Sequence, residues 1–250
     1  MDKTPNNIKD PWERTIVAFT PPYSLKDLCN AGSDVDHKKI PTFKIRIASS
    51  DDRIIQANTL VRKKYEWRGY EVQGLVSQPN YVTLIIYSDE KLVATMTLGV
   101  DSVNGLSADE SFKVELDSIR SKKSRRISEI TKFAIEDGFG SKQIQASIIH
   151  ITYIFARYVH ACTDFVIEVN PRHVQFYEKY LGFKTIGQEK YCLRVKAPSR
   201  LMHIDLDYMN QEIEQFGGSG MGRSKNGEKS LYPYFFRKTD EEGIAARLRK

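Results

Sequence analysis

The chain has 250 residues, 40% of them apolar, and a net charge of +6 with an isoelectric point near 9.0. This length and composition fit one sizeable domain with a core and tails, and they exclude a disordered chain. No apolar run approaches the ~20 residues of a membrane-spanning helix, so no transmembrane segment is expected. The first fifteen residues lack the apolar stretch of a secretory signal, and the three cysteines are odd in number and widely spaced. We therefore expect a cytoplasmic protein without disulfides.

The basic balance favours an acidic partner, which could be nucleic acid, an anionic membrane or an acidic carrier protein; a mildly basic protein without such a partner fits equally well. The sequence has no zinc finger, no RNP aromatic motif and no basic helix with heptads, so nucleic acid is not expected. His150 and His160 are ten positions apart on one predicted helix. A metal-binding pair needs i, i+4 spacing, so we predict no metal site.

In chain order, residues 1–41 are rich in Pro, Asn, Lys and Asp, and we expect a flexible arm there. Alternating apolar residues predict a strand at 43–47, and two apolar runs joined by Ser-Asp-Glu predict a hairpin at 81–100. The same kinds of pattern predict a helix from 51, a short helix around 112–119, strands at 125–136 and 164–170, helices from 142 and 171, strands at 184–195 and 201–206, and a helix at 208–216. Residues 219–250 are expected to form a basic, mobile tail, although 231–236 could dock somewhere on the protein.

The resulting order is β-α-β-β-insertion-β-α-β-α-β-β-α. Strands and helices alternate in its second half, which predicts an α/β (α+β) fold with a mixed central sheet and helices on both faces. No internal repeat interrupts this order.

Two stretches carry a resemblance to known families. Asn-Pro-Arg-His at 170–173, with Phe-Tyr at 176–177 and Leu-Gly-Phe at 181–183, resembles the passage from the fifth strand into the following helix in the GNAT superfamily. The stretch 125–135 resembles the Glu-Ile-Ser-Arg-Phe-Ala-Val strand of acyl-homoserine-lactone synthases, GNAT relatives that take acyl chains from acyl carrier protein. Together the motifs are similar to the N-acyl amino acid synthases (FeeM-like) over about residues 43–218.

The resemblance implies a GNAT-like acyltransferase domain at 42–218. It implies an N-acyltransferase that moves a long-chain acyl group from acyl carrier protein, or acyl-CoA, to the amino group of an amino acid, with no bound cofactor. Residues 137–142 lack the pyrophosphate-binding loop of the acetyl-CoA members, which argues against a conventional acetyltransferase. No Asp pair follows residues 65–72, so a signal-lactone synthase is the second hypothesis. A non-catalytic GNAT-like binding module is the third.

Glu129 is the candidate general base, because N-acylation needs a group that accepts the proton of the attacking amine. In a regular strand one face would carry Ile127, Glu129, Thr131, Phe133 and Ile135. A lone carboxylate among such residues is partly desolvated, which raises its pKa. The alternative is a structural glutamate paired with Arg125.

Other candidates follow from the family resemblance and from charge. Tyr177 is a candidate general acid for the leaving thiol, with a core aromatic as the alternative. Arg125 and Lys132 are candidates for binding the acceptor carboxylate, together with Thr131 on the face of Glu129 and a neutral His173 in the first turn of its helix. Simple solvation of the cations and a structural histidine are the alternatives.

A basic cluster directly precedes the strand that contains Glu129. Lys122, Lys123 and Arg126 belong to it, and such a patch would steer an acidic carrier protein toward the enzyme. A solvated run of charge is the alternative interpretation.

Overall fold

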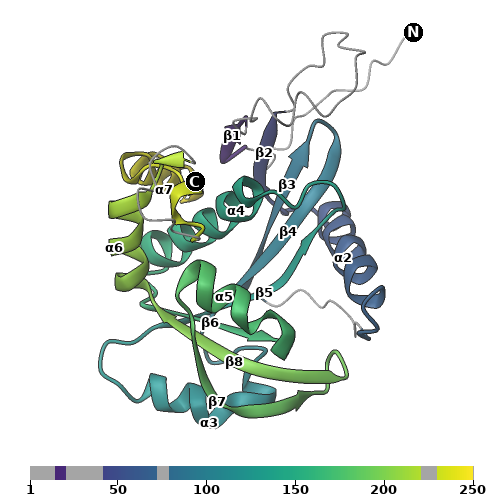
Figure 1. The fold of residues 1–250 in the computed structure, drawn as a ribbon, viewed down its shortest axis with the longest axis vertical. Coiled ribbons are helices and arrows are strands. Elements are labelled where there is room, and N and C mark those ends of the chain that lie inside the picture. Colours follow the sequence, from purple (N-terminus) through teal and green to yellow (C-terminus); the bar gives the residue numbers. More distant parts are fainter. Residues whose placement is uncertain (1–14, 21–41, 72–78, 221–229, 250) are drawn as a thin grey trace, which may run out of the picture.

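A computed structural model describes residues 15–20, 42–71, 79–220 and 230–249 (Figure 1). The described strands form one eight-stranded sheet of order β1-β2-β3-β4-β5-β6-β8-β7. Every neighbouring pair is antiparallel except β5 and β6. The strands are β1 (Val17–Phe19), β2 (Phe43–Ile47), β3 (Tyr81–Ser88), β4 (Lys91–Val100), β5 (Ile127–Ile135), β6 (Asp164–Val169), β7 (Lys184–Cys192) and β8 (Ala197–Asp205).

Helices cover both faces of the sheet. They are α2 (Asp51–Glu66), α3 (Asp109–Arg120), α4 (Lys142–Ile154), α5 (Val174–Leu181), α6 (Leu206–Phe216) and α7 (Glu241–Leu248). Ile85 packs under α2, whereas its neighbours Leu84 and Ile86 pack in the core around α4. Successive residues of a strand point to opposite faces, so α2 and α4 lie on opposite sides. Within the described residues, no helix is long and apolar enough to cross a bilayer.

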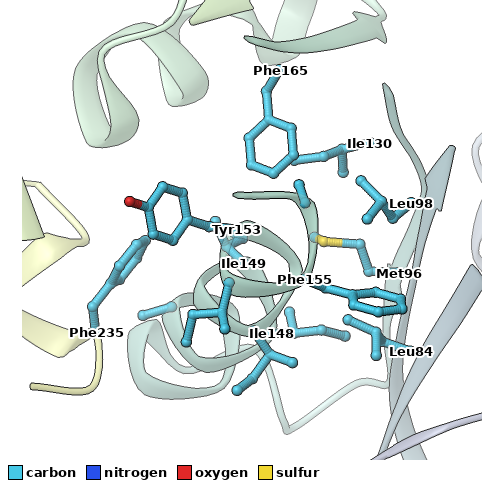
Figure 2. Packing of buried hydrophobic residues seen from close by; sticks show 14 of the residues in the cluster. Leu84, Met96, Leu98, Ile130, Ile148, Ile149, Tyr153, Phe155, Phe165 and Phe235 are labelled. Atoms are coloured by element: carbon cyan, nitrogen blue, oxygen red, sulfur yellow. The ribbon is translucent and has the colours of Figure 1, made fainter. Parts of the chain in front are cut away.

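The main core lies between the sheet and α4. Figure 2 shows α4 and the π-helical turn after it (Phe155–Val159) packed against the central strands. The labelled side chains are Leu84, Met96, Leu98, Ile130, Ile148, Ile149, Tyr153, Phe155, Phe165 and Phe235. α5 ends at Gly182, whose left-handed backbone (φ 81°) suits a residue without a side chain. The mixed sheet with helices on both faces, predicted from the order of elements, is confirmed.

The structure also contains elements that the sequence patterns did not predict. Val17–Phe19, inside the expected arm, pairs with β2. Residues 230–249, inside the expected tail, pack against α4 through the buried side chains of Leu231, Tyr232 and Phe235. Residues 1–14 and 21–41 of the predicted arm, and residues 221–229 and 250 of the tail, lie outside the described residues. The limits predicted for the acyltransferase domain stay a prediction.

A buried polar network fixes this C-terminal segment. The ring of His150 accepts a hydrogen bond at Nδ1 from the backbone N–H of Phe236 (3.0 Å) and contacts the Glu241 carboxylate through Nε2 (2.9 Å). Tyr158 and Lys238 donate to the same carboxylate at 2.8 and 2.7 Å. These partners satisfy a carboxylate that would otherwise be costly to bury.

We predict that Phe235→Ala destabilises the whole domain. Phe235 is 2% exposed and stacks on His150, with ring centroids 4.7 Å apart. The truncation should lower the free energy of unfolding by about 3–5 kcal/mol, because it leaves a cavity in the core. Denaturant unfolding measures this, with the exposed Val114→Ala on α3 as a control that should change by less than about 0.5 kcal/mol. Equal stability of the two variants would mean that the segment does not belong to the core.

Candidate functional site

The parallel strands β5 and β6 separate at their carboxyl ends. They pair from Ile127 opposite Asp164 to Ile130 opposite Ile167, and no pairing between the two described strands continues beyond that point. β5 nevertheless runs on to Ile135. Backbone N–H and C=O groups on the facing edges are therefore available to a ligand.

A bulge accompanies this separation. Lys132 has a positive φ of 53°, which is uncommon for a residue with a side chain. The pairing with β4 shifts here, so that Thr131 and Ala134 lie opposite Thr97 and Thr95. Since Thr95 and Thr97 share one face of β4, Thr131 and Ala134 share that face too, although they are three positions apart.

The bulge corrects one prediction about the surroundings of Glu129. Phe133 and Ile135 do not share its face; they pack on the core around α4. Ala134 lies on the same face as Glu129 instead, under α2. Ile127, at the other end of the strand, packs under α3. Glu129 consequently lies between the areas that α2 and α3 cover.

Glu129 is buried, with 1% of its surface exposed. Tyr81 donates a hydrogen bond from its hydroxyl to Glu129 Oε2 (2.8 Å), and the backbone N–H of Ser107 donates to the same oxygen (2.8 Å). Burial raises the pKa of Glu129, while Arg194 and these two donors oppose the rise. A desolvated carboxylate of this kind is suited to accept a proton.

Arg194 links several acidic groups beside Glu129. It lies in the turn between β7 and β8, forms an ion pair with Glu168 of β6, and lies 3.1 Å from the Glu110 carboxylate through Nε. The hydroxyl of Ser199 donates to the second oxygen of Glu168 (2.8 Å). The β7–β8 turn lies near the carboxyl end of β6, where Val169 is opposite Arg200 of β8. The cluster around Arg194 therefore borders the separation of β5 and β6.

Lys132 brings a second cation next to Glu129. Burial lowers the pKa of Lys132, Arg194 lowers it further, and the charge of Glu129 opposes both. Among the described residues its ammonium makes no ion pair or hydrogen bond. A half-buried cation without a partner is free to bind an anionic group of a ligand.

Tyr177 lies on the opposite face of the sheet, in the core around α4. Burial raises the pKa of this phenol, and the nearby Tyr65 of α2 raises it further. Burial also raises the pKa of Tyr65 to about 12, with Arg194 acting against the rise. Tyr65 therefore lies within electrostatic range of both Tyr177 and the cluster around Glu129.

His173 is a partly buried histidine at the start of α5. Burial and the charges of Arg172 and Arg68 lower its pKa, and Arg172 donates a hydrogen bond to its Nε2 (3.3 Å). A ring nitrogen that accepts a hydrogen bond is unprotonated, so this contact fits the neutral histidine that the sequence predicts. Burial and the two arginines favour the neutral form, whereas the sequence prediction rested on the helix terminus.

Arg125 is not brought to Glu129. Its guanidinium binds Asp205 at 2.6 Å and Asp164 at 3.3 Å, before the amino end of β5. Glu129 therefore lacks the structural partner that the alternative interpretation gave it. The same two ion pairs occupy the group that was expected to bind an acceptor carboxylate.

The basic cluster also lies at the amino end of β5. Lys122, Lys123 and Arg126 are all exposed and precede the strand. The strands separate at the other end, so the cluster and the separation lie on different sides of Glu129. Sequence reasoning missed Tyr81 and Arg194, because only the pairing of strands brings them to Glu129.

Three comparisons place the chain among known proteins. A family model described as N-acyl amino acid synthase FeeM matches residues 56–205. The solved structure of FeeM, an N-acyl amino acid synthase from uncultured soil microbes, is 26% identical with a TM-score of 0.63, covering 67% of this chain and 93% of that one. The acyl-homoserine-lactone synthase LasI (12%, TM-score 0.49, 66% and 90% covered) and a putative N-acetyltransferase from Lactobacillus plantarum (14%, TM-score 0.49, 66% and 98% covered) are also similar in fold. No curated protein matches in sequence.

We predict that Glu129→Gln stabilises the protein at alkaline pH. Because burial raises the pKa of Glu129, the folded chain binds this proton more tightly than the unfolded chain does. The resulting stability is present below about pH 4.3, the value for unfolded glutamate, and is lost as pH rises through the folded-state pKa. Glutamine cannot ionise and still accepts both hydrogen bonds.

The variant should therefore melt at a higher temperature than the wild type at pH 8 and show no such gain at pH 4. Thermal melting at both values measures this, with the exposed Glu90→Gln in the β3–β4 turn as control. A gain of the same size at both pH values would contradict the desolvation of Glu129.

Proposed function

The chain belongs to the N-acyl amino acid synthase FeeM family, and from that premise we propose that it transfers a long-chain acyl group from acyl carrier protein to the amino group of an amino acid. The family and the general activity of an N-acyltransferase, both predicted from the sequence, are confirmed. The observation that carries the finer proposal is the buried Glu129 carboxylate next to the separation of β5 and β6.

Glu129 is the proposed general base. The acceptor amine attacks the thioester carbonyl, a C–N bond forms and the C–S bond breaks. The proton of the amine passes to Glu129, whose Oε2 is held by Tyr81 and Ser107, so that Oε1 faces the reaction. Tyr177 lies on the other face of the sheet, and we propose that it gives a proton to the leaving thiolate through the separation of β5 and β6; its raised pKa keeps the phenol protonated until then.

The acceptor is proposed to bind on the α2/α3 side of the sheet. Lys132 pairs with its carboxylate, because this ammonium is half-buried and has no partner among the described residues. Thr131 lies on the same face as Glu129, and neutral His173 is a further hydrogen-bonding group for the substrate. Arg125 is left out because two aspartates already bind it.

The donor arm is proposed to enter where β5 and β6 separate. A phosphopantetheine arm contains amide groups, which can pair with free strand edges as a peptide strand does. Acyl carrier protein and acyl-CoA share this arm. The absence of a pyrophosphate-binding pattern at 137–142 favours the carrier protein. Lys122, Lys123 and Arg126 lie at the other end of β5 from this entrance, and we propose that they attract the acidic carrier protein from a distance. We propose that the protein acts in the cytoplasm, which fits two free, buried cysteines, Cys162 and Cys192.

Glu129→Gln should lower kcat and kcat/KM by on the order of 100- to 10,000-fold, because the amine proton loses its acceptor. The loss should shrink at high pH, where more of the amine is already neutral. Mass spectrometry of the products formed from palmitoyl carrier protein and a mixture of amino acids measures the rate. The exposed Glu90→Gln should keep full activity.

The same assay tests the proposed function itself. N-acyl amino acids are the expected product, whereas lactones, or acetylated proteins alone, would overturn the assignment. A folded Glu129→Gln variant with normal kcat would remove Glu129 from the mechanism.

Reversing Lys122, Lys123 and Arg126 to Glu should raise the KM for the acyl carrier roughly tenfold and leave kcat nearly unchanged, because these charges act in the encounter. Raising salt should weaken carrier use in the same way. A control reverses two cations elsewhere, Lys142 and Lys179, which lie over the Tyr180 ring at 5.4 and 5.9 Å. If KM for the acyl carrier rose only in the control variant, the carrier protein would be attracted by Lys142 and Lys179 instead. Equal, salt-independent use of acyl-CoA would contradict acyl carrier protein as the donor.

A further inference from the structure

Tyr81, Gly99 and Glu129 form one row across three neighbouring strands. Tyr81 of β3 lies opposite Gly99 of β4, and Gly99 lies opposite Glu129 of β5. The three strands are adjacent in the sheet (Figure 1). Side chains of residues in such a row point to the same face, so Tyr81 and Glu129 are on one side with Gly99 between them.

The middle position of this row, on β4, must be a residue without a side chain. Adjacent strands lie about 4.8 Å apart, so the backbones of Tyr81 and Glu129 are separated by roughly 10 Å. The tyrosine ring spans this gap by lying across β4. A Cβ atom on Gly99 would be 2.5 Å from Cε1 and 2.6 Å from Cζ of the ring, closer than atoms can approach.

Ser107 fixes the other end of the phenol. Its backbone N–H lies 2.6 Å from the Tyr81 hydroxyl oxygen and 2.8 Å from Glu129 Oε2, and its own hydroxyl lies 2.9 Å from that of Tyr81. The Tyr81 hydroxyl therefore accepts from the backbone of Ser107 while it donates its proton to Glu129. One orientation of the Tyr81 O–H bond makes all of these contacts at once: it points at Glu129 and leaves the oxygen to accept from Ser107.

The segment that supplies Ser107 is itself held by ion pairs. Asp109 accepts from the backbone N–H of Leu106 (2.7 Å), and Arg120 binds both Asp109 (2.6 Å) and Asp101 (2.7 Å). Arg120 thus joins both ends of the segment between β4 and α3. The Ser107 N–H is presented by a braced loop rather than by a free one.

We propose that Tyr81 is a positioning residue for Glu129, and that Gly99 is required because it leaves room for the phenol ring over β4. This inference rests on the proposed function, in which Glu129 is the base. By holding Oε2, Tyr81 and Ser107 leave Oε1 to meet the acceptor amine.

The same hydrogen bond tunes the base. Burial raises the pKa of Glu129, and the hydroxyl of Tyr81 limits the rise because it stabilises the ionised form. The other charged groups that act on Glu129 are Arg194 from the β7–β8 turn, Glu168 from β6 and Lys132 from β5 itself. A phenylalanine at position 81 leaves these three charged groups in place and removes the hydroxyl that donates to Glu129, while the Ser107 N–H keeps Glu129 Oε2 as its acceptor.

Tyr81→Phe is the first test. The acid limb of kcat/KM against pH should move up by about one pH unit, the effect of one hydrogen bond to a charged group, and kcat should fall. Tyr87→Phe is the matched control, because Tyr87 lies on the same strand and donates to Gln56 instead (2.7 Å). Its pH profile should match the wild type.

A second readout does not need enzyme activity. A ¹³C NMR titration of glutamate carboxyl groups, with Glu129→Gln to identify the signal, should place the Glu129 midpoint about one pH unit higher in Tyr81→Phe. An unchanged midpoint would overturn the positioning role. A shifted midpoint in a protein that acylates no amino acid would leave the positioning role standing and overturn the proposed function.

Gly99→Ala completes the set. The added methyl group should displace the ring and move the Glu129 midpoint in the same direction, but it should cause no further shift in the Tyr81→Phe background. Thermal melting checks that the variant folds. If it does not, Ser107→Ala removes the hydroxyl contact with Tyr81, keeps the backbone donor and should cause a smaller upward shift. Additive shifts in the double variant would overturn the role given to Gly99.

Discussion

Keeping a carboxylate inside a β-sheet is the constraint on which the site depends. A buried carboxylate costs free energy unless donors and cations surround it. Around Glu129 these come from four separate parts of the chain: a tyrosine from β3, a backbone N–H from the segment before α3, a lysine from the bulge of β5, and an arginine from the β7–β8 turn. Each of these elements is placed by its own packing, so the chemistry of one oxygen depends on the whole sheet.

The sequence allows the order of strands and helices to be predicted because each rests on a local pattern. Ile45 alternates with charged neighbours, and Gly182 follows the last turn of α5, as a strand and a helix end require. The surroundings of Glu129 could not be predicted in the same way. The bulge at Lys132 interrupts the alternation of faces along β5, from which the neighbours of Glu129 were predicted. No local sequence pattern predicts this bulge. Tyr81 reaches Glu129 only because of the register of three strands, which is a property of the sheet.

The charged groups divide into two classes that look alike in sequence. Arg125 and Arg120 are bound by aspartates and hold segments in place. Lys132 has no such partner in the described part of the chain, and Arg194 couples three glutamates. The neighbouring residues Arg125 and Arg126 show the difference most clearly, since one is tied to Asp164 and Asp205 and the other is exposed. Spacing along the chain does not separate these roles, because the partners of Arg120 and Arg125 lie anywhere from 3 to 80 positions away.

The contact between β1 and the C-terminal segment bears on how the protein is made. Arg247 donates to the carbonyl of Ile16, 231 positions away, and the Phe236 ring meets Phe19 at 5.9 Å. A ribosome that has just released β1 must therefore add more than two hundred residues before that strand receives its cover. Contacts between such distant residues close large loops and form late. During synthesis β1 therefore lacks its contacts with the C-terminal segment until residues 236–247 have been added.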